Sequence, residues 1–109
     1  MRRAKVLFKD EEAGILTQHD DGSFSFSYHE GWIANGDKPS ISLTLPKTEK
    51  VFHAQYLFPF FFNMLPEGSN KQVVCNLNRI DKDDHFGLLV TTAKNDSIGA
   101  VRVIKIENE

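Results

Sequence analysis

The stretch SFSFSY, residues 23–28, alternates three serines with three aromatic residues and is the clearest structural signal in the chain. Successive side chains of a β-strand point to opposite faces, so the alternation predicts a strand that buries its aromatic side chains and leaves its serines in water. Asp21 and Gly22 come just before it and favour a tight turn. The first third of the chain is therefore expected to be a β-structure with one buried and one wet face.

Further strands are predicted on both sides of this stretch. Residues 4–9 and 14–19 are short apolar runs that flank the acidic, turn-prone segment DEEAG at 10–14. Together they predict an antiparallel hairpin with a moderately long loop. Residues 41–46 alternate once more and stop at Pro46, which has no N–H to donate to a ladder, so a fourth strand is predicted there.

The segment YLFPFFFNMLPEG, residues 56–68, predicts a short helix instead of a strand. It shows no two-residue alternation, and the helix breakers Pro66 and Gly68 end it. Pro59 is expected in the first helical turn, where the missing N–H of proline costs little.

The last third predicts two more helices and a closing strand. Residues 69–80 predict a helix with Ser69 or Asn70 as its N-cap. Its apolar side chains are three and four positions apart and form one stripe that we expect to be buried, at positions 73, 74, 77 and 80. Residues 81–93 open on acidic residues, as helix N-termini favour, and carry Phe and Leu side chains that we expect to face inward. The β-branched run at 101–106 predicts a strand.

Strands followed by helices and a closing strand predict an α+β fold, in which helices are segregated to one side of an antiparallel sheet. We expect a small antiparallel sheet or partly closed barrel of about five to six strands, with about two to three short helices on one side. A chain of 109 residues has material for one core only, so residues 1–109 are expected to form a single domain.

The composition excludes several classes of protein. A net charge of −2 and a pI near 6.1 argue against direct binding of nucleic acid, because domains that bind phosphate backbones are usually basic. The sequence has one cysteine, no apolar run typical of a signal peptide, and no stretch near the ~20 apolar residues that cross a bilayer. We therefore expect a cytoplasmic protein without a membrane partner.

No catalytic, metal-binding or cofactor-binding residue can be assigned from the sequence. The histidines are scattered, without the spacing of a helical metal pair, at positions 19, 29, 53 and 85. Cys75 lies on an apolar helical stripe, where a small buried hydrophobe is expected. The acidic residues at 81–84 lack the Gly and Glu of a calcium loop, and the glycines form no phosphate-binding motif. We expect no enzyme activity, no metal and no cofactor.

The aromatic run leaves two interpretations open. On a helix, Phe58 and Phe62 share one face, whereas Phe60 and Phe61 point away from it. Either this helix is sandwiched between the sheet and the other helices of its own domain, or part of its aromatic ring is an exposed patch for a protein partner. No Lys or Arg occurs from residue 51 to residue 70, so a nucleic-acid stacking platform is excluded.

Trp32 carries the same two alternatives. It lies in residues 31–40, which are rich in Gly, Asn, Asp and Pro and predict a loop with one helical turn around Trp32 and Ile33. A tryptophan in such a loop either plugs its own core or serves as an anchor in a partner's pocket.

Three motifs follow one another in the second half of the chain: FFNMLPEG at 61–68, DHFGLL at 84–89 and DSIGAV at 96–101. They resemble the motifs of the N-terminal subdomain of the bacterial HipA-type toxin kinases, namely aromatic-x-x-Leu-Leu-Pro-Glu-Gly, Asp-x-Phe-x-Leu-Leu and Asp-x-x-Gly-Ala-Val. The opening strands are similar too, so the resemblance covers nearly the whole chain. Met64 stands where the family has the first Leu, and the usual Gly before the Asp is absent from TTAKND.

The resemblance implies a binding protein without catalysis. HipA-type kinases continue into an ATP site, a catalytic Asp and Mg²⁺ ligands, and these 109 residues contain none of them. A stand-alone copy of the subdomain is similar to HipS of the tripartite HipB-HipS-HipT toxin–antitoxin systems. The implied role is therefore a HipS-like antitoxin that neutralises a HipT-like Ser/Thr kinase, with a HipB-like helix-turn-helix DNA-binding protein in the same complex.

A second hypothesis is a structural assembly or dimerisation module, or an N-terminal fragment, of a HipA-type kinase without inhibitory activity of its own. The polar end KIENE, residues 105–109, favours a complete small protein. Ranked by size and expected exposure, the candidate partner-binding residues are Trp32, Phe58, Phe60, Phe61, Leu65, Pro66, Glu67 and Gly68.

Overall fold

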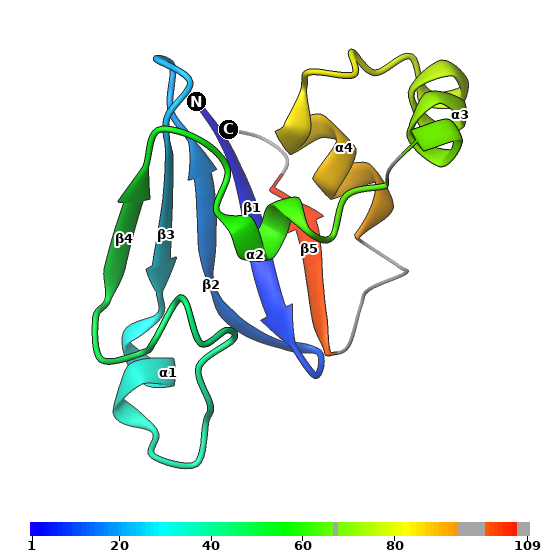
Figure 1. Ribbon diagram of the computed structural model, residues 1–109. Coiled ribbons are helices and arrows are strands. Elements are labelled where there is room, and N and C mark those ends of the chain that lie inside the picture. Colours follow the sequence, from blue (N-terminus) through cyan, green and yellow to red (C-terminus); the bar gives the residue numbers. More distant parts are fainter. Residues whose placement is uncertain (67, 94–99, 107–109) are drawn as a thin grey trace.

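The computed structural model describes residues 1–66, 68–93 and 100–106. In this part of the chain, five strands form one antiparallel sheet in the order β4-β3-β2-β1-β5, accompanied by four short helices (Figure 1). The elements are β1 (Arg2–Phe8), β2 (Glu11–Gln18), β3 (Phe24–Tyr28), α1 (Glu30–Ala34), β4 (Val51–Ala54), α2 (Pro59–Phe62), α3 (Gly68–Asn78), α4 (His85–Thr92) and β5 (Val101–Lys105). The predicted α+β fold is confirmed, and the sheet is open, not closed into a barrel.

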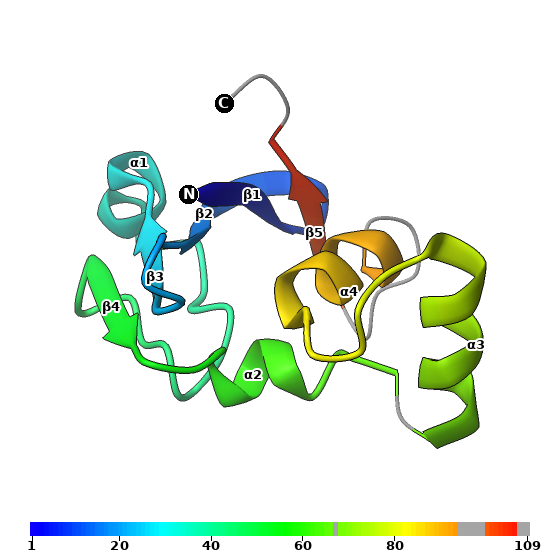
Figure 2. The ribbon, with the colours of Figure 1, turned by 90° about the horizontal axis from the view of Figure 1, so that it is seen from above.

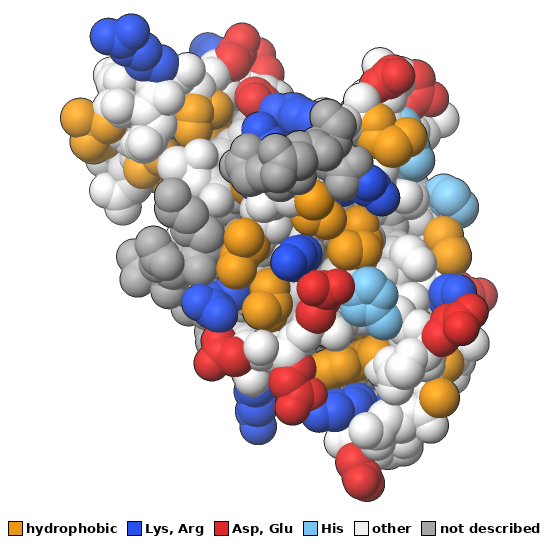
Figure 3. All heavy atoms as spheres, turned by 180° about the vertical axis from the view of Figure 1, so that it is seen from behind, with side chains coloured by type: hydrophobic (Ala, Val, Ile, Leu, Met, Phe, Trp, Pro, Cys, Tyr) orange, Lys and Arg blue, Asp and Glu red, His pale blue; other side chains and the backbone are white. Residues whose placement is uncertain are grey.

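The sheet is curved, and its two faces differ. Helices α2 and α4 lie against the concave face, whereas α3 lies beyond α4 and stands clear of the sheet (Figures 1 and 2). Seen from behind, the convex face carries apolar side chains interspersed with charged side chains and histidines (Figure 3). An antiparallel sheet commonly has one such face in water. None of the helices in the described ranges has the length and apolar character needed to span a bilayer.

The core forms on the concave face, where inward residues of neighbouring strands lie directly opposite each other. Phe26 of β3 pairs with Leu16 of β2, and Leu16 pairs with Ala4 of β1. All three side chains are fully buried. The residues that cover them from the helices are Phe61, Phe86, Leu88 and Leu89. The strand predicted from the SFSFSY alternation is thereby confirmed, because Phe24, Phe26 and Tyr28 are buried.

The first hairpin is tighter than predicted. Its loop consists of Lys9 and Asp10, which both have positive φ angles, of 50° and 67°. Two-residue hairpin loops favour such angles because their twist matches that of the strands. The expected loop at 10–14 is therefore wrong, since Glu11 to Gly14 already belong to β2. A register shift between Val6 and Leu7 takes up the extra residue.

The strand predicted at residues 41–46 is wrong. This segment forms a loop with one isolated bridge, between Ser42 and Leu45, and the fourth strand is the later β4. The hydroxyl of Tyr28 donates to the carbonyl of Leu45 and accepts from the backbone N–H of Ile41 at 3.0 Å. Ile41 and Leu45, near the two ends of the loop, are buried, whereas Leu43 between them is exposed. Burial raises the pKa of the Tyr28 hydroxyl.

The helices begin and end differently from the sequence predictions. Helix α2 is a single turn that starts at Pro59, as predicted, but ends at Phe62. Helix α3 begins at Gly68, so Ser69 and Asn70 lie inside its first turn and do not cap it. Helix α4 is capped by Asp84, which confirms the predicted acidic start. The closing strand β5 is confirmed, while residues 96–99 of the third motif lie outside the described ranges.

Gly14 provides a test of how closely the strands approach. A Cβ atom at Gly14 would lie 2.3 Å from the backbone oxygen of Ser27 and 2.9 Å from the ring of Phe26. We expect Gly14→Ala to lower the free energy of unfolding in urea by about 1–3 kcal/mol, because β2 and β3 must separate locally to admit the methyl group. Gly31→Ala is the matched control, since nothing lies within 4 Å of its Cβ position. Equal stability of the two variants would contradict this packing.

Candidate functional site

The aromatic segment is mostly used inside the molecule. The ring of Phe61 is fully buried and lies 5.9 Å from the ring of Phe26, measured between centroids. The rings of Phe58 and Phe60 pack around it at 6.4 Å and 5.1 Å. Of these, Phe58 is buried and Phe60 is partly buried. Helix α2 therefore mainly packs one aromatic cluster against β3.

Two aromatic side chains of the same segment remain on the surface. Tyr56 is exposed, and Phe62 keeps 46% of its surface in solvent. The ring of Phe62 contacts the edge of the His85 ring, at a centroid distance of 5.3 Å. Phe62 thus bridges α2 and α4 and still presents one side to water.

Trp32 lies in α1 and belongs to the hydrophobic core. Its side chain is buried, its ring packs edge-on against Phe8 at 6.0 Å, and its Nε1 donates to the carbonyl of Pro39 at 2.8 Å. Lys38 lies over the same ring, 5.4 Å from its centroid. The first of the two interpretations of Trp32, a plug of its own core, fits this geometry.

The turn after α2 links the core to α3. Leu65 is buried and Pro66 is half-buried, whereas Glu67 lies outside the described residues. Gly68 has a φ of +59°, a left-handed conformation that side chains other than hydrogen rarely adopt. The structure thus places Phe58, Phe61 and Leu65 in the hydrophobic core with Phe60 packed against it, and Trp32 belongs to the same core. A contact of any of them with a partner stays a prediction.

Helix α3 departs most from the sequence prediction. Only Cys75 of this helix is buried, and Val74 is partly buried against the core. The other two residues of the predicted buried stripe within α3 are exposed, Val73 by 53% and Leu77 by 78%. The stripe is wrong as a core face, because Val73 and Leu77 face solvent.

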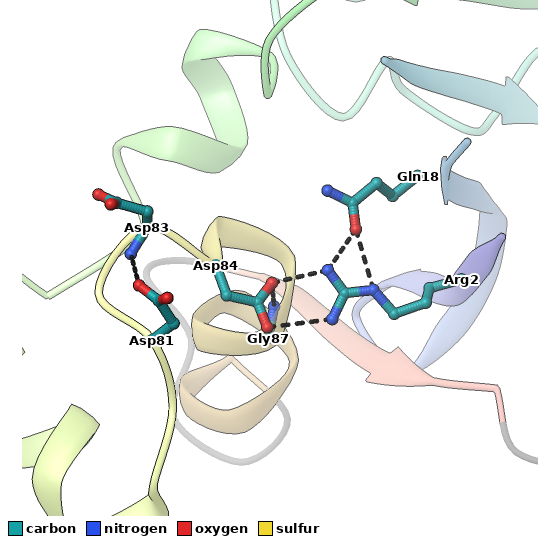
Figure 4. A network of polar contacts seen from close by, with 6 residues as sticks. All are labelled: Arg2, Gln18, Asp81, Asp83, Asp84 and Gly87. Atoms are coloured by element: carbon teal, nitrogen blue, oxygen red, sulfur yellow. Dashed lines mark hydrogen bonds and ion pairs between the residues drawn. The ribbon is translucent and has the colours of Figure 1, made fainter. Parts of the chain in front are cut away.

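The second motif has a structural role, which the polar network in Figure 4 explains. The carboxylate of Asp84 accepts from the backbone N–H of Gly87 at 3.0 Å and so caps α4. The same carboxylate accepts two hydrogen bonds from the guanidinium of Arg2 in β1, at 2.6 Å and 3.1 Å. Arg2 also donates through Nε to Gln18 at 2.9 Å. One side chain therefore starts α4 and ties it to the sheet.

The remaining positions of the DHFGLL motif complete this arrangement. Phe86, Leu88 and Leu89 are fully buried, and the guanidinium of Arg2 lies 4.8 Å from the centroid of the Phe86 ring. A Cβ atom at Gly87 would come within 2.4 Å of the Asp84 carboxylate. The motif is thus explained by the cap and the core.

The electrostatics of the cap follow from its partners. The hydrogen bonds from Arg2 hold the pKa of Asp84 below its ordinary value of 3.8, against the opposing effect of partial burial. The N–H of Gly87 acts in the same direction as Arg2. The carboxylate is therefore charged throughout the neutral range.

The titratable side chains elsewhere do not converge on one site. Within the described ranges, no group of three or more His, Cys, Asp or Glu residues could hold a metal ion. His19 contacts Ser25 at 3.0 Å, His29 pairs with Glu12, and Cys75 is a buried free thiol. These side chains have separate partners and offer no shared chemistry.

Comparison with known proteins identifies the fold family. The family model described as the HipA N-terminal domain matches residues 4–104. This chain belongs to the HipA N-terminal domain family. A solved structure, the N-terminal domain of HipA toxin, superposes on this HipA N-terminal domain with a TM-score of 0.74 and 31% sequence identity, over 100% of this chain and 96% of the other.

Two kinds of relative share this HipA N-terminal domain. An uncharacterized protein of Haemophilus influenzae (strain Rd) is 33% identical over 94% of this chain and 92% of its own length. "Putative kinase Y4mE" of Sinorhizobium fredii is 29% identical over 100% of this chain but only 26% of its own length. "Putative kinase Y4dM" of the same organism is 27% identical over 95% of this chain and 27% of its own length. The chain thus spans about a quarter of these two relatives.

Sequence reasoning missed the Arg2–Asp84 link and the exposed side of α3. The partners in the ion pair are 82 positions apart, and no local pattern connects them. The exposed Val73 and Leu77 gave a signal, an apolar pair at helical spacing, but that spacing does not show which side of a helix is covered.

Phe61 and Phe62 form a matched pair for testing which aromatic residues belong to the core. We expect Phe61→Ala to lower the free energy of unfolding by about 3–5 kcal/mol, because it empties the centre of the aromatic cluster. Phe62→Ala is expected to change it by about 1 kcal/mol or less, since its ring is half in water. Urea unfolding followed by circular dichroism measures both, and a larger loss for Phe62→Ala would contradict the assignment.

Asp84 allows the charge of the cap to be separated from its geometry. Asp84→Ala is expected to lower stability by about 1–3 kcal/mol through loss of the cap and of the partner of Arg2. Asp84→Asn keeps a good N-cap but removes the charge and one of the two oxygens that accept from Arg2, so its loss should be smaller than that of Asp84→Ala. Asp83→Ala, at an exposed neighbour, is the control.

The same variants predict a pH dependence. The pKa of Asp84 is lowered in the folded state, so its stabilising contribution is complete above the unfolded pKa of about 3.9 and is lost as the pH falls through the folded pKa. The stability difference between the wild type and Asp84→Asn should be constant from pH 7 to about pH 5 and should shrink below about pH 4. A difference that stays constant down to pH 2 would show that the charge of Asp84 contributes nothing.

Proposed function

We propose that this chain is a non-catalytic, antitoxin-like protein that binds a HipT-like Ser/Thr kinase and neutralises it. The observation that carries the proposal is the pattern of coverage among relatives. The same unit accounts for 26% of one kinase-named relative and for 92% of a short relative. The unit thus occurs both as part of a long chain and as nearly the whole of a short chain. As a separate short chain, such a unit is suited to bind the part of the long chain that it lacks.

The surface of the molecule supports a partner. We infer that in the longer relatives this unit contacts the rest of its own chain, and that the contact surface becomes free when the unit is separate. Exposed apolar side chains include Phe62 of α2 and the pair Val73 and Leu77 of α3. The pair on α3 is four positions apart and therefore adjacent, and adjacent exposed apolar side chains are typical of interaction sites.

The absence of catalysis is part of the proposal. The family match is confined to the HipA N-terminal domain, and the polar residues that form the Asp84 network serve a helix cap. We propose that the protein works by binding alone, in the cytoplasm, and that a HipB-like helix-turn-helix protein contributes the DNA contacts of the complex. The net charge of −2 agrees with a protein that does not itself bind DNA.

The alternative function is a structural assembly or dimerisation module, or an N-terminal fragment, of a HipA-type kinase. The match of 100% of this chain to about a quarter of a kinase-named protein is what such a fragment would also give. The reading frame beside this one discriminates between the two. A kinase frame that lacks this unit favours the antitoxin, whereas a frame continuous with this chain favours the fragment.

Co-expression tests the proposed function directly. Cells that express the neighbouring kinase are expected to stop growing, and this chain is expected to restore growth and to co-purify with the kinase. An inactive kinase variant serves as the control for toxicity. If the chain binds the kinase without restoring growth, the assembly alternative holds; if it does neither, the proposed function is wrong.

A further inference from the structure

Helix α3 is an unusual surface element of this molecule. It lies beyond α4 and clear of the sheet (Figures 1 and 2), and it packs on the rest of the described chain mainly through Cys75 and Val74. Val73 and Leu77 are one turn apart and therefore neighbours on the opposite side. We call the side of α3 with Val73 and Leu77 the α3 ridge.

The α3 ridge lacks charge. Among the eleven residues of α3, GSNKQVVCNLN, Lys71 is the single charged residue, and it lines a pocket of about 480 Å³ with Cys75 and Ile80 on another side of the helix. Solvent-facing sides of helices normally carry charged residues. Depletion of charge around apolar side chains is the signature of the centre of an interface.

The chemistry of the α3 ridge defines its occupant. Two apolar side chains at i and i+4, flanked by neutral amides and hydroxyls, are the anchors of a helix that lies in an apolar groove. A partner surface rich in lysine or glutamate would place its charges against the α3 ridge, where they would find no opposite charge. The partner surface must therefore be an uncharged, mainly apolar groove.

A second copy of this chain fits the α3 ridge poorly. An eleven-residue helix is roughly 16 Å long, so a contact that this helix alone makes with a second copy is short. A stable interface needs about 800 Å² from each partner. A groove covers both flanks of the helix and therefore buries more of its surface.

We propose that α3 docks, through Val73 and Leu77, into an uncharged apolar groove on the kinase. This inference rests on the proposed function and names the surface that carries it out. The longer relatives match this unit over its whole length, α3 included, so the remainder of such a chain is the natural source of the groove.

The test compares two exposed apolar sites in one molecule. The variants are V73A/L77A, which shortens the anchors and keeps good helix formers, and V73E/L77E, which adds charge. Leu43→Glu is the control, because Leu43 is 99% exposed in the loop between Ile41 and Leu45. The dissociation constant for the purified kinase is measured by titration calorimetry, and circular dichroism with thermal melting verifies the fold of each variant.

The expected results follow the size of the change. V73A/L77A should weaken kinase binding by about tenfold or more, and V73E/L77E by about a hundredfold or more, while Leu43→Glu binds within about twofold of the wild type. Melting temperatures of all folded variants should stay close to that of the wild type, because both anchors lie in solvent.

Three outcomes would overturn the inference. If the wild type binds and neutralises the kinase and both double variants bind equally well, α3 is not the docking element, and the proposed function stands. If sedimentation shows a wild-type dimer that V73E/L77E dissociates, the occupant of the α3 ridge is a second copy. If the wild type does not bind the kinase, the proposed function and this inference are both wrong.

Discussion

The structure depends on the covering of the concave face of its sheet. Phe61 from α2 and the apolar residues of α4 lie on β1, β2 and β3 and remove their inward side chains from water. Each buried aromatic or leucine side chain contributes roughly 1.5–3 kcal/mol. Because α2 is one turn long and α4 has eight residues, neither would be stable alone. Their burial therefore fixes the positions of both helices.

This covering decides which side chains remain for a partner. A run of aromatic residues in a small protein looks like a binding patch, but Phe58 and Phe61 are used to close the molecule's own core. Fully buried rings contact a partner only after the core opens, which costs several kcal/mol for each ring exposed. The apolar side chains that the core does not need stay exposed, among them Phe62 of α2 and Val73 and Leu77 of α3.

The sequence predicted an element correctly where its residue pattern has a single physical cause. In SFSFSY the alternation arises from burial on one face of a sheet, and the strand was predicted correctly. At residues 41–46 the same alternation occurs in a loop that the Tyr28 hydroxyl holds by its backbone, and the central Leu43 is exposed, so the predicted strand was wrong. In α3 the apolar spacing is helical, but Val73 and Leu77 face solvent. Periodicity reports the local conformation and cannot report which side tertiary packing covers. For the same reason, an ion pair between residues as distant as Arg2 and Asp84 leaves no local trace.

A unit shared by long and short chains also has to meet different energetic demands. Within one chain, a flexible linker supplies an effective concentration in the millimolar range, so weak contacts suffice to hold the unit in place. A separate chain at micromolar concentration or below must gain about 4 kcal/mol or more from the interface itself. Two well-buried aliphatic side chains supply an amount of this order. An exposed apolar pair such as Val73 and Leu77 is therefore the kind of feature that the proposed binding as a separate molecule requires.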